Sequence, residues 1–284
     1  MREHILELIQ EKKNIPPLPD ILHRLEAKIG SPKSQVSDIA ILIETEPILS
    51  GRLIQLSNSV FFGGSGSKVE RLPDAIIRLG LKMILDLAYT LELPQLFLRE
   101  SDLNQKKFWQ HSLAVAILAR LLAEHLEELH CEPDPCYLSG LMHDIGIMVF
   151  NFIVPQEYNA FLKEVRGIDK PLQVLEQKRF GIAHPELGAE FIKKWWPIPA
   201  EVTLSVEKHF LEMSEKGKKY PVLLSVIMAN DIANHFGMGH GISAHKETPD
   251  RSFMQGCGLT PDLLEDLVGK TRDSLHMAQE VLYK

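Results

Sequence analysis

The chain has 284 residues, of which 45% are hydrophobic and 24% are charged, and its formal net charge is −7 at pH 7. This composition is typical of a folded globular protein and excludes an intrinsically disordered chain. A negative net charge also argues against binding to a phosphate backbone, which requires clustered Lys and Arg, so we expect no nucleic-acid partner.

The cysteines and the N-terminal sequence indicate the compartment. Cys131, Cys136 and Cys257 form no CxxC pair, and one of them stays unpaired under any single disulfide. Free thiols in a reducing compartment are therefore expected. The first residues, MREHILELIQEKK, lack the apolar run of a signal peptide. No segment approaches the roughly 18 uninterrupted apolar residues of a membrane span, so we expect a cytoplasmic protein without a membrane partner.

Helical periodicity dominates the first part of the chain. A short helix is predicted within residues 1–14, ahead of a proline-rich break. Residues 15–100 predict an N-terminal layer of several helices, in which apolar residues such as Ile39, Leu42 and Ile43 recur at steps of three and four. Strand-like alternation is scarce, so the predicted fold class is all-α.

The second part of the chain predicts a further set of helices over residues 101–238. The longest continuous helical pattern covers residues 108–129, and an apolar helix follows it that contains the pair His143-Asp144. Residues 239–284 predict a long exposed connection rich in Gly, His, Pro and Ser, and then an amphipathic C-terminal helix that packs back on the body.

The pair His143-Asp144 is the most informative feature, because an imidazole and a carboxylate follow apolar residues on a helix that must otherwise be buried. Burying both costs several kcal/mol unless each is paired. Adjacent side chains point about 100° apart on a helix, so a metal ion between them can accept both. The alternative is a hydrogen-bonded core histidine beside a helix-capping aspartate, and these residues alone do not separate the two.

Most of the other histidines lie among charges on predicted helix surfaces. His235, His240 and His245 recur at five-residue steps, but the glycines between them prevent a regular helix face that would direct all three at one ion. We do not expect a metal site there.

Six blocks of sequence, in order, resemble the HDOD domain, a signalling relative of the HD phosphohydrolases. The first half contains IPPLPDILHRLEAKIGSP, IETEPILSGRLIQLSNSVFFG and LPDAIIRLGLKMILDLA, and the second half contains FWQHSLAVAILARLLA, LSGLMHDIGIMVF and EQKRFGIAHPELGAEFIKKWWPIP. The resemblance covers roughly residues 15–238. It implies a multi-helix HD-type domain with the N-terminal helical layer packed on it, in a bacterial regulatory context.

The resemblance also implies a metal site. His111, His143 and Asp144 match the first three ligand positions of an HD site, and His184 and His209 match further ligand positions of the bimetallic branch. Imidazole and carboxylate ligands suit Fe, Mn, Zn or Ni, and water bound at an open coordination position would attack a phosphoester.

Three departures from the family pattern argue against efficient catalysis. The last ligand of an HD site is an aspartate, but Asn230 takes that place here and Asp231 follows it, about 100° away on a helix. Asn is neutral and a poor ligand, so the fourth ligand is left open between these two. Ile147 stands where catalytic relatives commonly have a phosphate-binding lysine, and Phe210 follows His209 where the bimetallic branch has paired histidines.

These observations predict a signal-transduction output module that acts mainly by binding a signalling protein or a small ligand, with an HD-like cleft for a divalent metal. The alternative is a metal-dependent phosphohydrolase or phosphodiesterase acting on a nucleotide or cyclic dinucleotide. A third interpretation is a helical scaffold whose histidines only satisfy hydrogen bonds. We expect weak or absent phosphodiesterase activity, and an output that comes from the packing of the N-terminal layer against the HD half.

Overall fold

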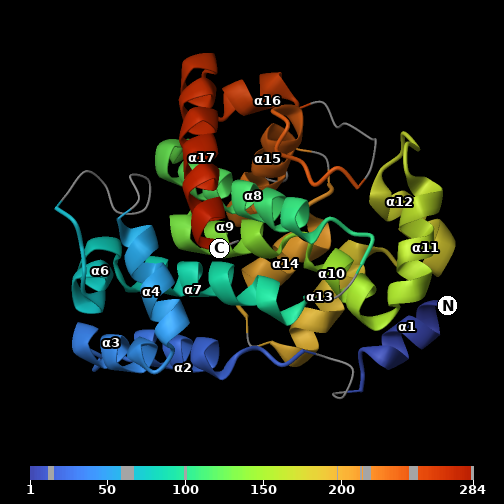
Figure 1. Ribbon diagram of the computed structural model, residues 1–284. Coiled ribbons are helices and arrows are strands. Elements are labelled where there is room, and N and C mark those ends of the chain that lie inside the picture. Colours follow the sequence, from blue (N-terminus) through green and yellow to red (C-terminus); the bar gives the residue numbers. More distant parts are fainter. Residues whose placement is uncertain are drawn as a thin grey trace. The chain divides into compact units, whose positions relative to one another are not determined.

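The computed structural model describes residues 1–11, 16–58, 67–98, 101–196, 198–211, 213, 219–242 and 249–282, and every regular element in these ranges is a helix (Figure 1). The predicted all-α fold class is confirmed. The chain divides into two compact units. The first unit comprises Met1–Pro16 and Phe97–Val268, and the second comprises Pro17–Leu96 and Gly269–Lys284.

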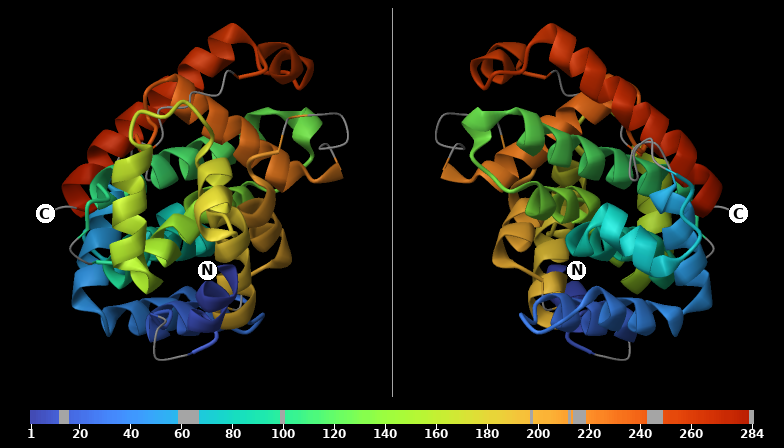
Figure 2. Two further views of the ribbon diagram at one scale, coloured as in Figure 1. Left: turned by 90° about the vertical axis from the view of Figure 1, so that its right-hand side faces the viewer. Right: turned by 90° about the vertical axis from the view of Figure 1, so that its left-hand side faces the viewer.

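The second unit is a cluster of short helices, drawn blue to cyan in Figure 2, joined by the end of the C-terminal helix. The short helices are α2 (Asp20–Ile29), α3 (Val36–Glu44), α4 (Pro47–Ser57), α6 (Leu72–Leu79) and α7 (Leu81–Leu96). α2 packs on α3 and α7, and α6 packs on α3, α4 and α7. The apolar stripe predicted from Ile39, Leu42 and Ile43 is buried. Tyr89 of α7 donates a 2.6 Å hydrogen bond to Glu26 of α2, which ties these two helices together.

The core of the first unit is formed by three helices that all contact one another: α8 (Gln105–His125), α9 (Pro133–Met142) and α15 (Pro221–His235). The side chain of Asn104 caps α8 by accepting from the Lys107 amide at 3.0 Å. α8 and α9 cross closely, because a Cβ on Gly140 would lie 2.7 Å from the Ala116 Cα. Only glycine fits at this crossing, which brings the end of α9 to the middle of α8.

Three further helices continue from this core: α10 (Ile145–Ile153), α13 (His184–Trp195) and α14 (Ala200–Lys208). α10 packs on α13, α13 packs on α14, and α14 packs on α9 and α15. The first turn of α10 lies against the start of α13, since a Cβ on Gly146 would be 1.9 Å from the His184 carbonyl oxygen. The ends of several helices are thereby brought close together.

The remaining helices of the first unit surround this assembly. They are α1 (Arg2–Leu8), α11 (Pro155–Val165), α12 (Leu172–Phe180), α16 (Arg251–Gly256) and a short 3₁₀ helix, η2 (Glu127–Leu129). α1 is attached to α13, because Arg2 pairs with Glu186 at 2.9 Å and Trp195 donates to the Ile9 carbonyl at 2.7 Å. The chain ends with α17 (Pro261–Leu282), and the division between the units falls within it.

The expectation of a long exposed connection after residue 238 is wrong for its second part. Asp250 caps α16 by accepting from the Phe253 amide at 3.0 Å, and Met254 and Cys257 are buried. A capped turn with apolar residues three apart explains why this segment packs onto the unit. All three cysteines are free, as expected, although the sulfur atoms of Cys131 and Cys136 lie 3.5 Å apart.

One stretch, Pro133–Ile153, is long and apolar enough to cross a membrane by length and composition, and 89% of its most apolar window is buried inside the fold. The turn at His143-Asp144 divides this stretch into α9 and α10. It therefore forms two interior helices of the first unit.

Candidate metal centre

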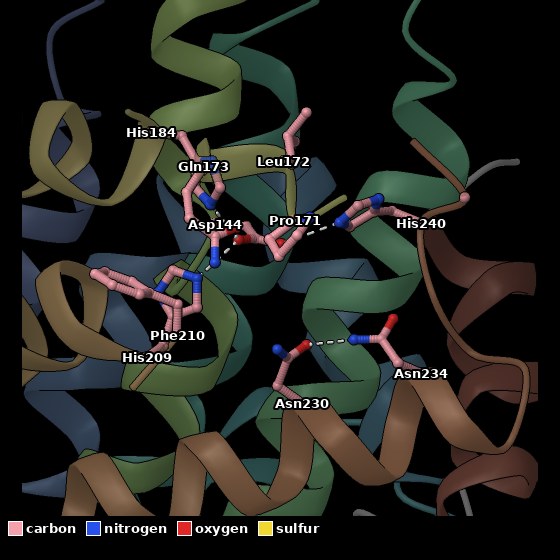
Figure 3. Close-up of a pocket in the computed structure, with 11 residues that line it drawn as sticks. Asp144, Pro171, Leu172, Gln173, His184, His209, Phe210, Asn230, Asn234 and His240 are labelled. Carbon is pink, nitrogen blue, oxygen red and sulfur yellow. Dashed lines mark hydrogen bonds and ion pairs between the residues drawn. The ribbon is translucent and has the colours of Figure 1, made fainter. Parts of the chain in front are cut away.

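Asp144, at the N-terminus of α10, lies at the centre of a cluster of histidines (Figure 3). Five imidazole Nε2 atoms lie within 3.7 Å of its two carboxylate oxygens. Oδ2 faces His143 at 3.1 Å, His240 at 3.4 Å and His111 at 3.7 Å, and Oδ1 faces His209 at 3.2 Å and His184 at 3.3 Å.

Each of these histidines comes from a different element. One lies within a helix and four lie at helix ends or just beyond them: His111 in α8, His143 after α9, His184 at the start of α13, His209 after α14 and His240 after α15. The close crossings at Gly140 and Gly146 explain why these positions converge. The rings are buried except that of His240, whose side chain is 15% exposed.

Hydrogen bonds to oxygen atoms orient four of the five rings. The Nδ1 atoms of His111, His143 and His209 contact the carbonyl oxygens of Met238 (3.0 Å), Gly140 (2.8 Å) and Val206 (3.0 Å), and the Nδ1 of His184 contacts Glu176 Oε2 at 2.6 Å. A carbonyl or carboxylate oxygen only accepts, so each Nδ1 carries a proton. In the neutral ring the Nε2 lone pair then faces Asp144, as in metal-bound histidines.

Two of these Nε2 atoms have no other partner. The Nε2 atoms of His111 and His143 are buried and make no hydrogen bond to any described residue. Lone pairs facing a carboxylate oxygen in a buried site are unfavourable unless a cation lies among them. The residues present therefore fit a metal ion.

The ligand atoms form two sets, in each of which they lie within 4.8 Å of one another: His111, His143 and Asp144 in one, and Asp144, His184 and His209 in the other. Asp144 belongs to both sets, with Oδ2 toward His111 and His143 and Oδ1 toward His184 and His209, so it would be a ligand in either set.

Electrostatics in the cluster follow from burial and from the neighbouring groups. Burial alone would raise the pKa of Asp144, but the surrounding histidines outweigh it and hold this pKa well below its ordinary value. Burial, together with His240 and His143, holds the pKa of His111 well below its ordinary value. Burial opposes a charge on His184 as well, but Glu176 and Asp144 outweigh it and raise the pKa of His184 to about 10. Without metal, His184 is thus an imidazolium between two carboxylates.

Glu176 was not singled out in the sequence. It is fully buried on α12 and accepts from the Tyr158 hydroxyl (2.6 Å), the His184 amide (2.8 Å) and His184 Nδ1 (2.6 Å). The sequence does contain a signal, because Glu176 lies four residues from both Leu172 and Phe180 on the buried face of α12. A carboxylate in the middle of an apolar stripe requires buried donors.

The structure brings together the five residues His111, His143, Asp144, His184 and His209, in two sets that share Asp144. Metal binding by them stays a prediction. The two candidates for the fourth ligand differ in position. Asn230 lines the adjacent pocket and its Oδ1 accepts from Asn234 at 2.9 Å, while Asp231 is in neither set among the described residues.

His240 joins the cluster although no motif in the sequence predicted it. Gly237 and Gly241, with φ of 80° and 70°, allow the chain to turn back after α15. His235 instead contacts Arg251 at 3.1 Å, and His245 lies outside the described residues. The expectation that the three histidines do not converge holds for His235 and His240.

A pocket opens beside the cluster, and Figure 3 shows Asp144, His184, His209 and His240 among the residues that line it. Its other walls come from Pro171, Leu172, Gln173, Phe210, Asn230, Asn234 and Gly241. Ile147, at the position of the expected lysine, is fully buried and is not among these lining residues.

Comparison with known proteins gives a single family. The model of the HDOD domain matches residues 15–210. A protein of Treponema pallidum (strain Nichols), itself uncharacterized, is 27% identical over 218 residues, which are 76% of this chain and 42% of that protein. The chain thus spans less than half the length of this relative.

Solved structures share the fold. An HDOD domain protein of unknown function from Geobacter sulfurreducens has a TM-score of 0.74 at 24% identity, covering 98% of this chain and 93% of that chain. A Shewanella amazonensis SB2B protein, provisionally named a phosphohydrolase, has a TM-score of 0.72 at 20% identity over 97% of both chains. A Marinobacter aquaeolei VT8 protein, provisionally named a signal transduction protein, has a TM-score of 0.72 at 21% identity, covering 95% of this chain and 60% of that chain.

Proposed function

The chain belongs to the HDOD domain family, and we propose that it is a signal-transduction output module that acts mainly by binding a ligand at a divalent metal centre. The observation that supports this most directly is the shared carboxylate of Asp144, faced by four imidazoles whose Nδ1 atoms are each bonded to an oxygen. That arrangement directs four Nε2 atoms at one carboxylate, where protons or a metal ion must compensate the Nε2 lone pairs.

Two ions fit the residues. His111, His143 and Asp144 would hold one, and Asp144, His184 and His209 would hold the other. Nitrogen and carboxylate ligands suit Fe, Mn, Zn or Ni. Bound there, such ions supply Lewis acidity toward a phosphate oxygen or toward water. The protein's own contribution is to orient the imidazoles through Met238, Gly140, Val206 and Glu176 and to keep the centre largely buried.

Binding is favoured over turnover because the pocket has few groups that could stabilise a phosphoryl transition state. None of the described lining residues is Lys or Arg, and Asn230 lines the wall in place of a carboxylate. Losing one charge-assisted contact forfeits about 1.5–3 kcal/mol, which corresponds to roughly 10- to 100-fold in rate. We therefore expect weak or absent phosphodiesterase activity.

The second candidate is a metal-dependent phosphohydrolase acting on a nucleotide or cyclic dinucleotide. The observation that favours it is that the Oδ1 side of Asp144, with His184 and His209, borders an open pocket, so that a substrate could reach an ion held there.

Elemental analysis of untagged protein tests the proposal. After loading with Mn, Fe, Zn or Ni and removal of free metal, wild type should retain one to two equivalents, and His143→Ala should lose at least one. His4→Ala, at an exposed position of α1, is the matched control and should retain the wild-type amount. A wild type that retains no metal would contradict the proposal. Turnover of a simple phosphodiester with Mn or Fe, abolished in His143→Ala, would instead establish the second candidate.

A further inference from the structure

His240 has the opposite hydrogen-bonding pattern from the other four histidines. The Ile242 amide donates to its Nδ1 at 3.1 Å. A backbone N–H only donates, so this Nδ1 keeps its lone pair and the proton of the neutral ring is on Nε2. The Nε2–H of His240 therefore points at Asp144 Oδ2, 3.4 Å away, where the other rings present lone pairs.

The segment that holds His240 is attached to the cluster at several points. Met238 accepts from His111 Nδ1 at 3.0 Å, and its own amide donates to the Ala233 carbonyl at 2.8 Å. Gly239 packs against the side chain of Asn234, since a Cβ there would lie 2.5 Å from the Asn234 Oδ1. These contacts fix the backbone just before His240, and the hydrogen bond from the Ile242 amide orients the ring itself.

A metal ion bound to Asp144 would change what His240 can contact. The carboxylate would then be shared with the ion, so its oxygens become weaker acceptors for the Nε2–H of His240. The ring is also the most exposed of the five and forms a wall of the pocket (Figure 3). An N–H at that position can donate to a ligand oxygen that is bound at the metal centre.

We propose that His240 is a ligand-positioning residue, whose Nε2–H donates to an oxyanion such as a phosphate group held at the centre. This inference rests on the proposed function. It adds an N–H beside Asp144 to a wall whose other polar side chains include the amides of Gln173, Asn230 and Asn234 and whose described residues include no Lys or Arg. It also predicts that His240 is not a metal ligand, since coordination through Nε2 would require the ring to give up the Ile242 hydrogen bond.

The test compares full-length wild type, His240→Ala, His240→Gln and the control His235→Ala, all loaded with the same metal. Bound metal is measured by elemental analysis, and the Kd of inorganic phosphate is measured by calorimetry. We expect all four proteins to hold the same metal. His240→Ala should bind phosphate about 10- to 100-fold more weakly, the range for a hydrogen bond to a charged group. His240→Gln, which keeps an N–H donor, should recover part of the affinity, and His235→Ala should match wild type.

Three results would overturn the inference. Loss of metal in His240→Ala would make His240 a ligand. Equal phosphate affinity in wild type and His240→Ala would remove its role in binding, as would wild type that holds metal but binds no phosphate at millimolar concentration. In each of these cases wild type still holds metal, so the proposed metal centre survives. A wild type without metal would defeat the proposed function and the inference together.

Discussion

Glu176 fixes the orientation and the Nδ1 proton of His184. Its carboxylate accepts hydrogen bonds from the His184 ring, from the His184 backbone amide and from the Tyr158 hydroxyl. Replacing it by an amide of equal size removes the charge and places an N–H where an acceptor is needed. We expect Glu176→Gln to weaken metal binding about 10- to 100-fold, the usual effect of losing a carboxylate behind a ligand histidine. It should also lower the free energy of unfolding by about 1–3 kcal/mol. Competition with a chromogenic chelator and denaturant unfolding measure these two quantities.

The control for this prediction is Tyr158→Phe, which removes a donor to Glu176 but leaves its bonds to His184 in place. It should lower stability while leaving metal affinity near that of wild type. If Glu176→Gln binds metal as tightly as wild type does, Glu176 only satisfies hydrogen bonds.

Five of the site residues could be located from the sequence, because four lie in long blocks of recognisable pattern and His209 follows the last of these blocks. His240 could not be located, since its place depends on a turn at Gly237 and Gly241 and on contacts with His111 that no local pattern encodes. Glu176 is an intermediate case. Its position on the apolar stripe of α12 can be read from the sequence. The donors that hydrogen-bond its carboxylate lie on other elements and cannot.

At the scale of elements, the centre depends on how closely α10 approaches α13. A Cβ on Gly146 would lie 1.9 Å from the His184 carbonyl oxygen and 2.9 Å from the Gly188 amide nitrogen. Both are backbone atoms, so a helix must move, and His184 must move with it. We expect Gly146→Ala to destabilise the protein by about 3 kcal/mol, the upper end for overpacking, and to lose the ion held by His184 and His209. Thermal unfolding and metal content provide the measurement.

The same substitution on another helix is the control for Gly146→Ala. Gly51 lies in α4, and a Cβ there would have no neighbour within 4 Å. Gly51→Ala should therefore stabilise the protein, by about 1 kcal/mol, because alanine favours the helix. If Gly146→Ala and Gly51→Ala change the stability of the protein equally, the close contact between α10 and α13 does not require glycine at position 146.

The helices themselves could be predicted from the sequence, but their partners could not. Periodicity in residues 1–14 predicts a helix but not its partner. In the structure α1 attaches to α13 through the pairs Arg2–Glu186 and Ile9–Trp195, whose members lie more than 180 residues apart in the sequence. Apolar spacing likewise misses α16, because this helix has only six residues, contains Ser and Gly, and follows a segment rich in the Gly, Pro and Ser typical of loops.

At the scale of the whole molecule, local patterns predict the fold class but not which segments form one unit. The first unit contains both Met1–Pro16 and Phe97–Val268. A fragment of residues 101–284 would therefore lack part of this unit, including the partners of Glu186 and Trp195. The expectation that output depends on packing between the two halves of the chain stays a prediction, and a truncation that removes the N-terminal layer to test it should keep the first sixteen residues.

Metal binding should be coupled to the stability of the first unit, because the candidate ligands come from four or more helical elements that are distant in sequence. An unfolded chain cannot hold these ligands together, so a bound ion stabilises only the folded state. Free metal at 100 times its Kd contributes about 2.7 kcal/mol, which corresponds to a rise in Tm of several degrees. We expect a chelator to lower the Tm of wild type and His4→Ala by this amount and to lower the Tm of His143→Ala by less, because that variant keeps at most the ligands Asp144, His184 and His209. If wild type contains metal by elemental analysis and its Tm does not respond to the chelator, the ion is bound elsewhere than at Asp144.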